Sequence, residues 1–147
     1  MTPKFDPDIV LAKASNVRRS IETIRSLAEP RHAGLSDWIK LDVTVLNLQR
    51  AVESLSDLAH HVISESGWEL PRDGRHAFRI LAQHGLLKPP ETKLAESMVG
   101  FRNVAVHDYA TLDPEIVRGI AKDRLGDLEA LVSSLLQELR GSAGSGL

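Results

Sequence analysis

The chain contains no cysteine. This absence excludes disulfide bonds, thiolate nucleophiles, and zinc or iron–sulfur sites that are built on cysteine. Long apolar runs are also missing, because none approaches the roughly 18–20 residues that a membrane-spanning helix needs. The first ten residues, MTPKFDPDIV, lack the basic-then-apolar order of a secretory signal. Together these absences predict a cytoplasmic protein without a membrane segment.

Positive charge is not in excess either, since the formal net charge is −2 at pH 7. A protein that binds long nucleic acid without sequence preference is usually basic overall. Binding of nucleic acid would therefore need a local basic patch, although the candidate arginines are more typical of solvated helix faces. The candidates are Arg18, Arg19, Arg25, Arg72, Arg75 and Arg79.

Strand signals are almost absent, and there is no internal repeat or glycine-rich phosphate loop. The 147 residues, 42% of them hydrophobic, suit a single domain with one core. Apolar residues recur at alternating spacings of four and three, which is typical of amphipathic helices. The sequence therefore predicts an all-α fold, an antiparallel bundle of about five helices in residues 1–140. Residues 141–147, GSAGSGL, have the composition of a flexible tail.

Helix boundaries follow from caps and breakers. Asp6-Pro7-Asp8 and Asp113-Pro114-Glu115 each place a capping aspartate before a proline at the first helical position, so each predicts a helix start. The second of these starts predicts one last helix that continues to about Arg140. Between them we expect helices over 36–64 and 74–84, and a fourth that begins near Pro90. The stripe on the helix over 36–64 is regular enough to pack on a long partner helix and can also supply a subunit interface. It comprises Leu41, Val45, Leu48, Val52, Leu55, Ala59 and Val62, and is widened by Trp38, Ile39, Leu46, Leu58 and Ile63.

The fourth helix leads into an octet with unusual polarity, RNVAVHDY, residues 102–109. Asn103 and His107 are four residues apart and should share a helix face. Arg102 and His107 are five apart, roughly 140° around the axis, which a long arginine side chain can bridge in part. Val104 should point into the core, and Tyr109 should lie at the helix end or in the following turn.

An arginine and a histidine suit phosphodiester chemistry. A guanidinium can hold phosphate oxygens with paired hydrogen bonds, and an imidazole can move protons near neutral pH. On RNA, such a pair could cleave without a metal, and a symmetric dimer would supply two copies of each group. The alternative from the residues alone is structural: a histidine that caps helix-end carbonyls and an arginine that pairs with an acidic residue.

The octet resembles the R-x4-H-x-Y signature of the HEPN superfamily in its HepT-like branch. The order of the segments AVESLSDLAHHVISESGWELP and HAFRILAQHGLL before it is also similar, so the resemblance covers roughly residues 5–140. It implies a helical, usually homodimeric toxin of a toxin–antitoxin system, with a metal-independent ribonuclease site at the dimer cleft. By position, Arg102 and His107 would be the catalytic pair, and Asn103 would orient His107 or a phosphate. The implied partner is a minimal nucleotidyltransferase (MNT) antitoxin that silences the toxin by transferring AMP from ATP to Tyr109.

A second polar group lies on the helix expected over 36–64. Asp57 and His61 are four residues apart, a spacing that can present two ligands to a metal. No third ligand is evident, so we expect no metal and no cofactor, and we expect these residues to support the Arg–His site. Two other functions stay open: a non-catalytic helical module that binds a nucleotide or a partner, and a substrate-binding subunit for a nucleotidyltransferase.

Overall fold

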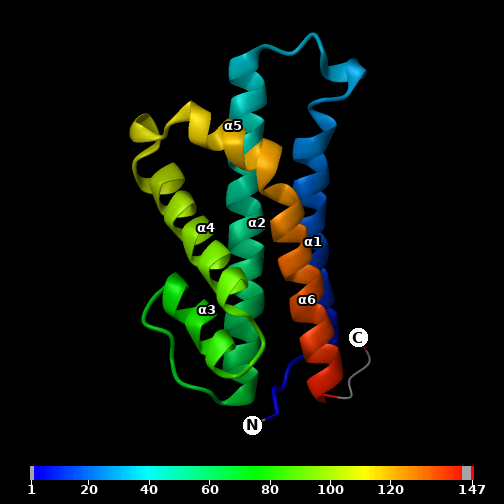
Figure 1. Ribbon diagram of the computed structural model, residues 1–147, viewed down its shortest axis with the longest axis vertical. Helices are drawn as coiled ribbons and strands as arrows, with labels where there is room; N and C mark the ends of the chain where they lie inside the picture. Colours follow the sequence, from blue (N-terminus) through cyan, green and yellow to red (C-terminus); the bar gives the residue numbers. More distant parts are fainter. Residues whose placement is uncertain (1, 144–146) are drawn as a thin grey trace.

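The computed structural model describes residues 2–143 and 147, and in this part of the chain it contains six α-helices and no strand. Figure 1 shows the helices as one bundle with the termini at the same end. The predicted all-α class is confirmed. The helices are α1 (Pro7–Ser26), α2 (Asp37–Ser66), α3 (Gly74–Gln83), α4 (Pro89–His107), α5 (Pro114–Asp123) and α6 (Leu125–Ala143), with short 3-10 turns η1 (Pro30–His32) and η2 (Tyr109–Thr111).

Side-chain caps begin the helices where the sequence predicted them. Asp6 Oδ1 accepts the Asp8 N–H at 2.9 Å to begin α1, and Asp113 begins α5 in the same way. At the start of α3, Asp73 Oδ1 accepts the His76 N–H at 2.8 Å. This backbone hydrogen bond lowers the pKa of the Asp73 carboxyl below its ordinary value.

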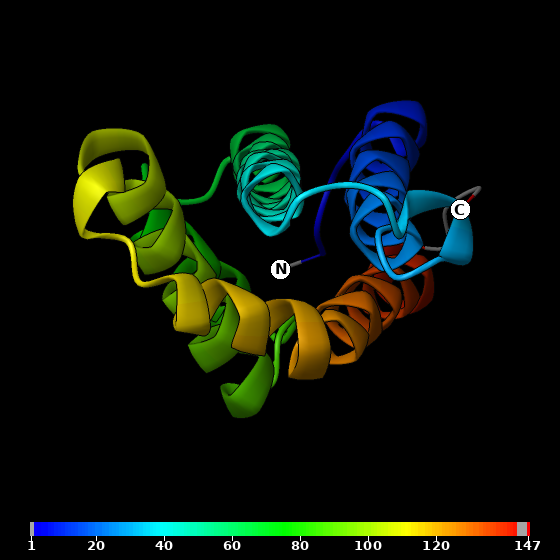
Figure 2. The same ribbon diagram turned by 90° about the horizontal axis from the view of Figure 1, so that it is seen from above.

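The core forms where α2 packs between its neighbours. α2 lies beside α1 along its length, α6 packs on α1, and α3 and α4 contact α2 (Figures 1 and 2). The regular stripe predicted on α2 is buried except at Leu41, which is half-buried. The widened stripe was wrong at two positions, because Trp38 is 67% exposed and Leu46 is 45% exposed. Both lie on the α2 face that the described helices leave uncovered.

The last helix predicted from the sequence is two helices. The chain bends at Arg124, whose backbone angles (φ −113°, ψ −10°) depart from helical values, although its N–H still reaches the Ile120 carbonyl at 2.9 Å. The bend lets α5 contact α2 through the buried Val117, while α6 turns to lie along α1. A straight helix could not follow both partners, and Figure 1 shows the change of direction.

The C-terminal boundary also differs from the expected one. α6 continues to Ala143, past the predicted end at Arg140. The rest of the predicted tail, residues 144–146, lies outside the described residues, and Leu147 is partly buried against the core. Across the described residues, none of the helices combines the length and the apolar character that a membrane span requires.

Candidate functional site

The guanidinium of Arg102 is held between two side chains. Its Nε and Nη2 atoms both lie 3.4 Å from Oε1 of Glu53 on α2, and its Nη1 donates to Oδ1 of Asn103 at 3.4 Å. The arginine side chain is 32% exposed, so it can still be reached from solvent. Asn103 therefore contacts Arg102 in this chain; the sequence had suggested that it orients His107 or a phosphate.

Arg102 opens onto a polar pocket of about 390 Å³ between α2, α4 and the start of α3. The pocket brings Arg102, Asn103 and Asp57 together, although Asp57 also pairs with Lys13 Nζ at 3.0 Å. Sequence reasoning did not assign Glu53 or Asp73 to this site. Glu53 could have been found, because Glu53, Asp57 and His60 recur at the four-and-three spacing of one α2 face. The lining residues are Val52, Glu53, Ser56, Asp57, His60, Asp73, Gly74, Val99, Arg102 and Asn103.

His61 does not line this pocket, contrary to the supporting position expected for it. Its Nε2 accepts the Asp6 N–H at 2.8 Å, so the ring fastens the segment before α1 to α2. The reason is helical geometry: His60 and His61 are about 100° apart around α2, and only one of them can face α4.

His107 is the last residue of α4 and is exposed. Among residues 2–143 and 147 nothing forms a hydrogen bond or ion pair with its ring, so it does not cap the helix carbonyls. Nor does it line the Arg102 pocket, so the structure of one chain does not bring the predicted catalytic pair into one cavity. The imidazole remains accessible to a substrate or to a second subunit.

The apolar residues of the octet differ from expectation. Val104 is 37% exposed and Val106 is 41% exposed, whereas Ala105 and Phe101 are buried and anchor the helix. Val104 does not point into the core: it lines an open, mainly apolar pocket of about 760 Å³ between α4 and α5. Arg102, Asn103 and His107 are absent from the lining of this pocket.

Tyr109 follows α4 in the η2 turn, and its side chain points back to α2. The Oη atom donates a short hydrogen bond to Oδ1 of Asp42. This hydrogen bond, followed by partial burial and the negative charge of Asp42, raises the pKa of the Tyr109 phenol above its ordinary value. Tyr109 is nevertheless 48% exposed, so an incoming group can reach the hydroxyl.

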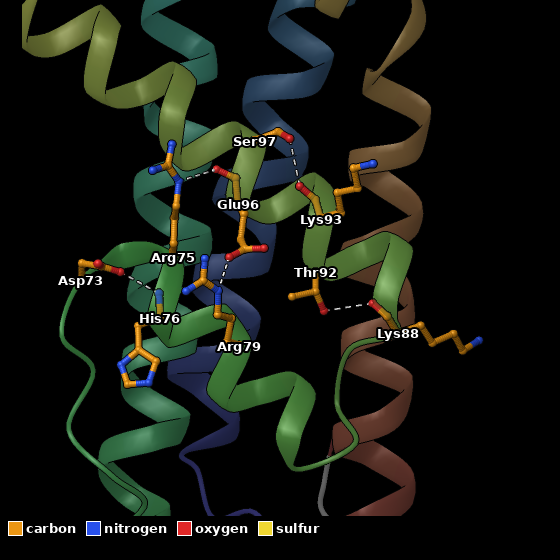
Figure 3. A network of polar contacts seen from close by, with 9 residues as sticks. All are labelled: Asp73, Arg75, His76, Arg79, Lys88, Thr92, Lys93, Glu96 and Ser97. Carbon is orange, nitrogen blue, oxygen red and sulfur yellow. Dashed lines mark hydrogen bonds and ion pairs between the residues drawn. The ribbon is translucent and has the colours of Figure 1, made fainter.

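A polar network fixes α3 against α4 beside the pocket (Figure 3). The Arg79 guanidinium pairs with the Glu96 carboxylate, and Arg75 Nε donates to the Glu96 carbonyl at 3.4 Å. Arg75 passes so close to α4 that a Cβ added at Gly100 would lie 2.6 Å from its Nη2 atom. Arg75 and Arg79, two of the candidates for a basic patch, therefore contact the helix that carries Arg102.

In the described ranges, 2–143 and 147, no cluster of three or more histidine, aspartate or glutamate side chains could hold a metal ion. The arrangement provides a partly exposed guanidinium in a polar pocket, an accessible imidazole at the helix end, and an accessible phenol with a carboxylate partner. These are groups that bind phosphate, transfer protons and accept a covalent modification.

Comparison with known proteins identifies the class of protein. The model of the ribonuclease HepT-like family matches residues 17–135. The chain therefore belongs to this family, which confirms the resemblance of the octet and of its helical setting to the HepT-like branch of the HEPN superfamily.

Named relatives agree with that assignment. The mRNA nuclease HepT of Shewanella oneidensis is 32% identical over 131 residues, which cover 89% of this chain and 98% of that protein. A solved structure of the tri-AMPylated Shewanella oneidensis HEPN toxin in complex with MNT antitoxin aligns with a TM-score of 0.80 and 31% identity, over 90% of this chain and 99% of that one. The cytosolic protein YutE of Bacillus subtilis aligns over 100% of this chain and 99% of its own, with a TM-score of 0.81 but 13% identity, and so shows the shared fold alone.

Proposed function

We propose that this chain is the cytoplasmic toxin of a toxin–antitoxin system, a ribonuclease that cleaves RNA without a metal and is silenced by AMPylation. The observation that carries the proposal is the octet of a HepT-like chain at the end of α4, with Arg102, His107 and Tyr109 all accessible. The Shewanella oneidensis relative is named an mRNA nuclease, which supports RNA as the substrate class.

In the proposed reaction, Arg102 binds the scissile phosphate and stabilises the charge that develops on it. His107 removes the 2′-hydroxyl proton or protonates the leaving oxygen. Asn103 keeps the guanidinium in place through its 3.4 Å contact. Asp57 shapes the far side of the pocket, where its carboxylate is already paired with Lys13.

We further propose that the active form is a homodimer whose motifs face each other across a cleft. Cleavage needs both an acid and a base, and one chain provides a single histidine in the octet. The exposed apolar side chains on α2 and at the end of α4, which include Trp38, Leu46 and Val106, are suited to an interface of this kind. Light scattering on the purified protein is expected to give twice the chain mass.

Regulation would be by a cognate MNT antitoxin that transfers AMP from ATP to Tyr109. The Shewanella oneidensis complex, a tri-AMPylated HEPN toxin with MNT antitoxin, supports this partner and this modification. An AMP group on Tyr109 adds bulk and negative charge directly after the helix that carries His107, and both oppose RNA binding there.

The decisive experiment is RNA cleavage by purified, unmodified protein. His107→Ala is expected to reduce the rate by about 10²–10⁴-fold and Arg102→Ala by about 10²–10³-fold. Matched controls are His32→Ala and Arg31→Ala, because these residues lie in η1, where the His32 ring bonds to the Ser26 carbonyl and Arg31 pairs with Glu29. Equal RNA cleavage by wild type and by both octet variants would disprove the assigned site, whereas no cleavage by any of them would favour the non-catalytic binding module.

A further inference from the structure

The contact between Tyr109 and Asp42 joins two segments that are 67 residues apart in the sequence. Tyr109 lies in η2, directly after the α4 helix, and Asp42 lies in the second turn of α2. Both side chains are exposed, so the hydroxyl and its carboxylate partner can be approached together by another protein. No sequence pattern pointed to Asp42.

AMPylation requires Tyr109 Oη to act as a nucleophile. A phenol with an ordinary pKa near 10 keeps its proton at neutral pH, so the proton must leave as the new bond forms. An aspartate carboxylate, with an ordinary pKa near 3.9, is ionised there and can accept that proton. Asp42 Oδ1 already accepts the hydrogen bond from this hydroxyl.

We propose that Asp42 is the proton acceptor for modification of Tyr109, so that the toxin itself supplies the base for its own silencing. As Oη attacks the α-phosphorus of ATP held by the nucleotidyltransferase, an Oη–P bond forms and the bond from that phosphorus to the β-phosphate oxygen breaks. Pyrophosphate leaves, and the phenolic proton moves to Oδ1 of Asp42. This inference rests on the proposed function, in which Tyr109 is the AMP acceptor.

Other charged groups around the contact do not offer the same role. Asp42 is the charged group that acts on the Tyr109 phenol, and the charged residues on the neighbouring segments form no hydrogen bond or ion pair with either partner. Those residues are Asp37 and Lys40 on α2, His107 and Asp108 at the end of α4, and Asp113, Glu115, Arg118 and Lys122 around α5.

The direction in which loss of the Asp42 charge changes the rate of AMP addition separates two mechanisms. Asp42 raises the pKa of Tyr109 and so opposes formation of a free phenolate. If modification needed a phenolate formed in advance, loss of the Asp42 charge would speed it up. If the proton leaves during attack, loss of the carboxylate removes the acceptor and slows the reaction.

The test uses unmodified full-length protein, the cognate nucleotidyltransferase and Mg²⁺-ATP, with intact-mass measurement of AMP addition over time. Asp42→Asn is expected to slow addition by about 10²–10⁴-fold near pH 7. Between about pH 6 and 9 the wild-type rate should be nearly independent of pH, since an ordinary carboxylate stays ionised over this range. The Asp42→Asn rate should instead rise about tenfold per pH unit, because the phenolate must then form first.

Controls keep the outcomes distinct. Asp37→Asn removes another carboxylate from α2 and should leave the rate unchanged, whereas Asp42→Glu should retain the pH-independent profile. An Asp42→Asn rate equal to or faster than wild type overturns the proposal, and so does a loss of the same size at every pH, which indicates a structural role alone. If wild-type protein gains no AMP, or if Tyr109→Phe gains as much AMP as wild type, the proposed function of Tyr109 as AMP acceptor fails instead.

Discussion

Glu53 and the RNA phosphate should compete for Arg102, and the variant Glu53→Gln tests this competition. The Glu53 carboxylate contacts two guanidinium nitrogens at 3.4 Å, with the two side chains 48% and 32% exposed. At that distance and in water, the attraction between unit charges is about 1.2 kcal/mol. Measured exposed pairs contribute about 0–1 kcal/mol. Bound phosphate must displace a contact worth about 1 kcal/mol.

Removal of the Glu53 charge should therefore tighten RNA binding by about fivefold. A contact worth about 1 kcal/mol corresponds to this factor, since ~1.4 kcal/mol is a tenfold change in binding constant. Glutamine keeps the shape and an acceptor oxygen, so kcat should stay nearly constant. The assay is steady-state cleavage of a short fluorescent RNA, in which the KM of Glu53→Gln should fall about fivefold. The free energy of unfolding should change by no more than about 1 kcal/mol.

The matched control is Glu65→Gln, which makes the same change in net charge on the same helix. Glu65 is exposed, and no ion pair to it is found within the described residues. Because it lies more than a Debye length of about 8 Å along α2 from Glu53, it should leave the KM unchanged. An unchanged or higher KM for Glu53→Gln would refute the competition, and a hundredfold loss of kcat would place Glu53 in the chemistry.

Further predictions concern the phenol, a turn and the core. Because Tyr109 is the one tyrosine of the chain, its phenolate absorbance in an alkaline titration should report a pKa above the ordinary ~10, and Asp42→Asn should lower it. The raised pKa means that this hydrogen bond stabilises the fold below about pH 10 and that the stabilisation is lost as pH rises through the folded-state pKa. Gly85→Ala should cost about 1 kcal/mol in urea unfolding, because Gly85 has φ +78°, whereas Gly119→Ala within α5 should stabilise by up to about 1 kcal/mol. Leu135→Ala should cost about 2–5 kcal/mol, because the side chain is fully buried; a smaller loss would mean that the core around α6 can collapse into the space.

Local rules predicted the fold class and most helix starts, because caps and apolar periodicity act within a few residues. The bend at Arg124 was not predictable in this way, since it depends on α5 and α6 packing against different helices. Trp38 and Leu46 show the same limit: both fit an apolar stripe, yet which part of a stripe is covered depends on where the neighbouring helices lie.

The same limit applies to the candidate site: its local motif was predictable, and its long-range contacts were not. The octet itself could be recognised, and Asp57, which was expected to support the Arg–His site, lines the same pocket as Arg102. Glu53 and Asp42 could not be assigned from sequence, because their partners lie 49 and 67 residues away and meet them only in the folded bundle. His61 was misplaced because a rotation of one residue around α2 moves a side chain to a different neighbour.

Helix α2 carries the partners of two octet residues: Asp42 contacts Tyr109, and Glu53 contacts Arg102. Asp42 and Glu53 are eleven positions apart on α2, which places them on nearly the same face and about 16 Å apart along the axis. That length is about twice the ~8 Å over which salt screens exposed charges at physiological ionic strength. In a single subunit, the charge of one AMP at the Tyr109 end is therefore largely screened at Arg102. If Tyr109 is the AMP acceptor, as proposed, its modification would act on Arg102 through the length of the attached nucleotides or across the second subunit of the proposed dimer, because α2 holds the two positions at a fixed separation.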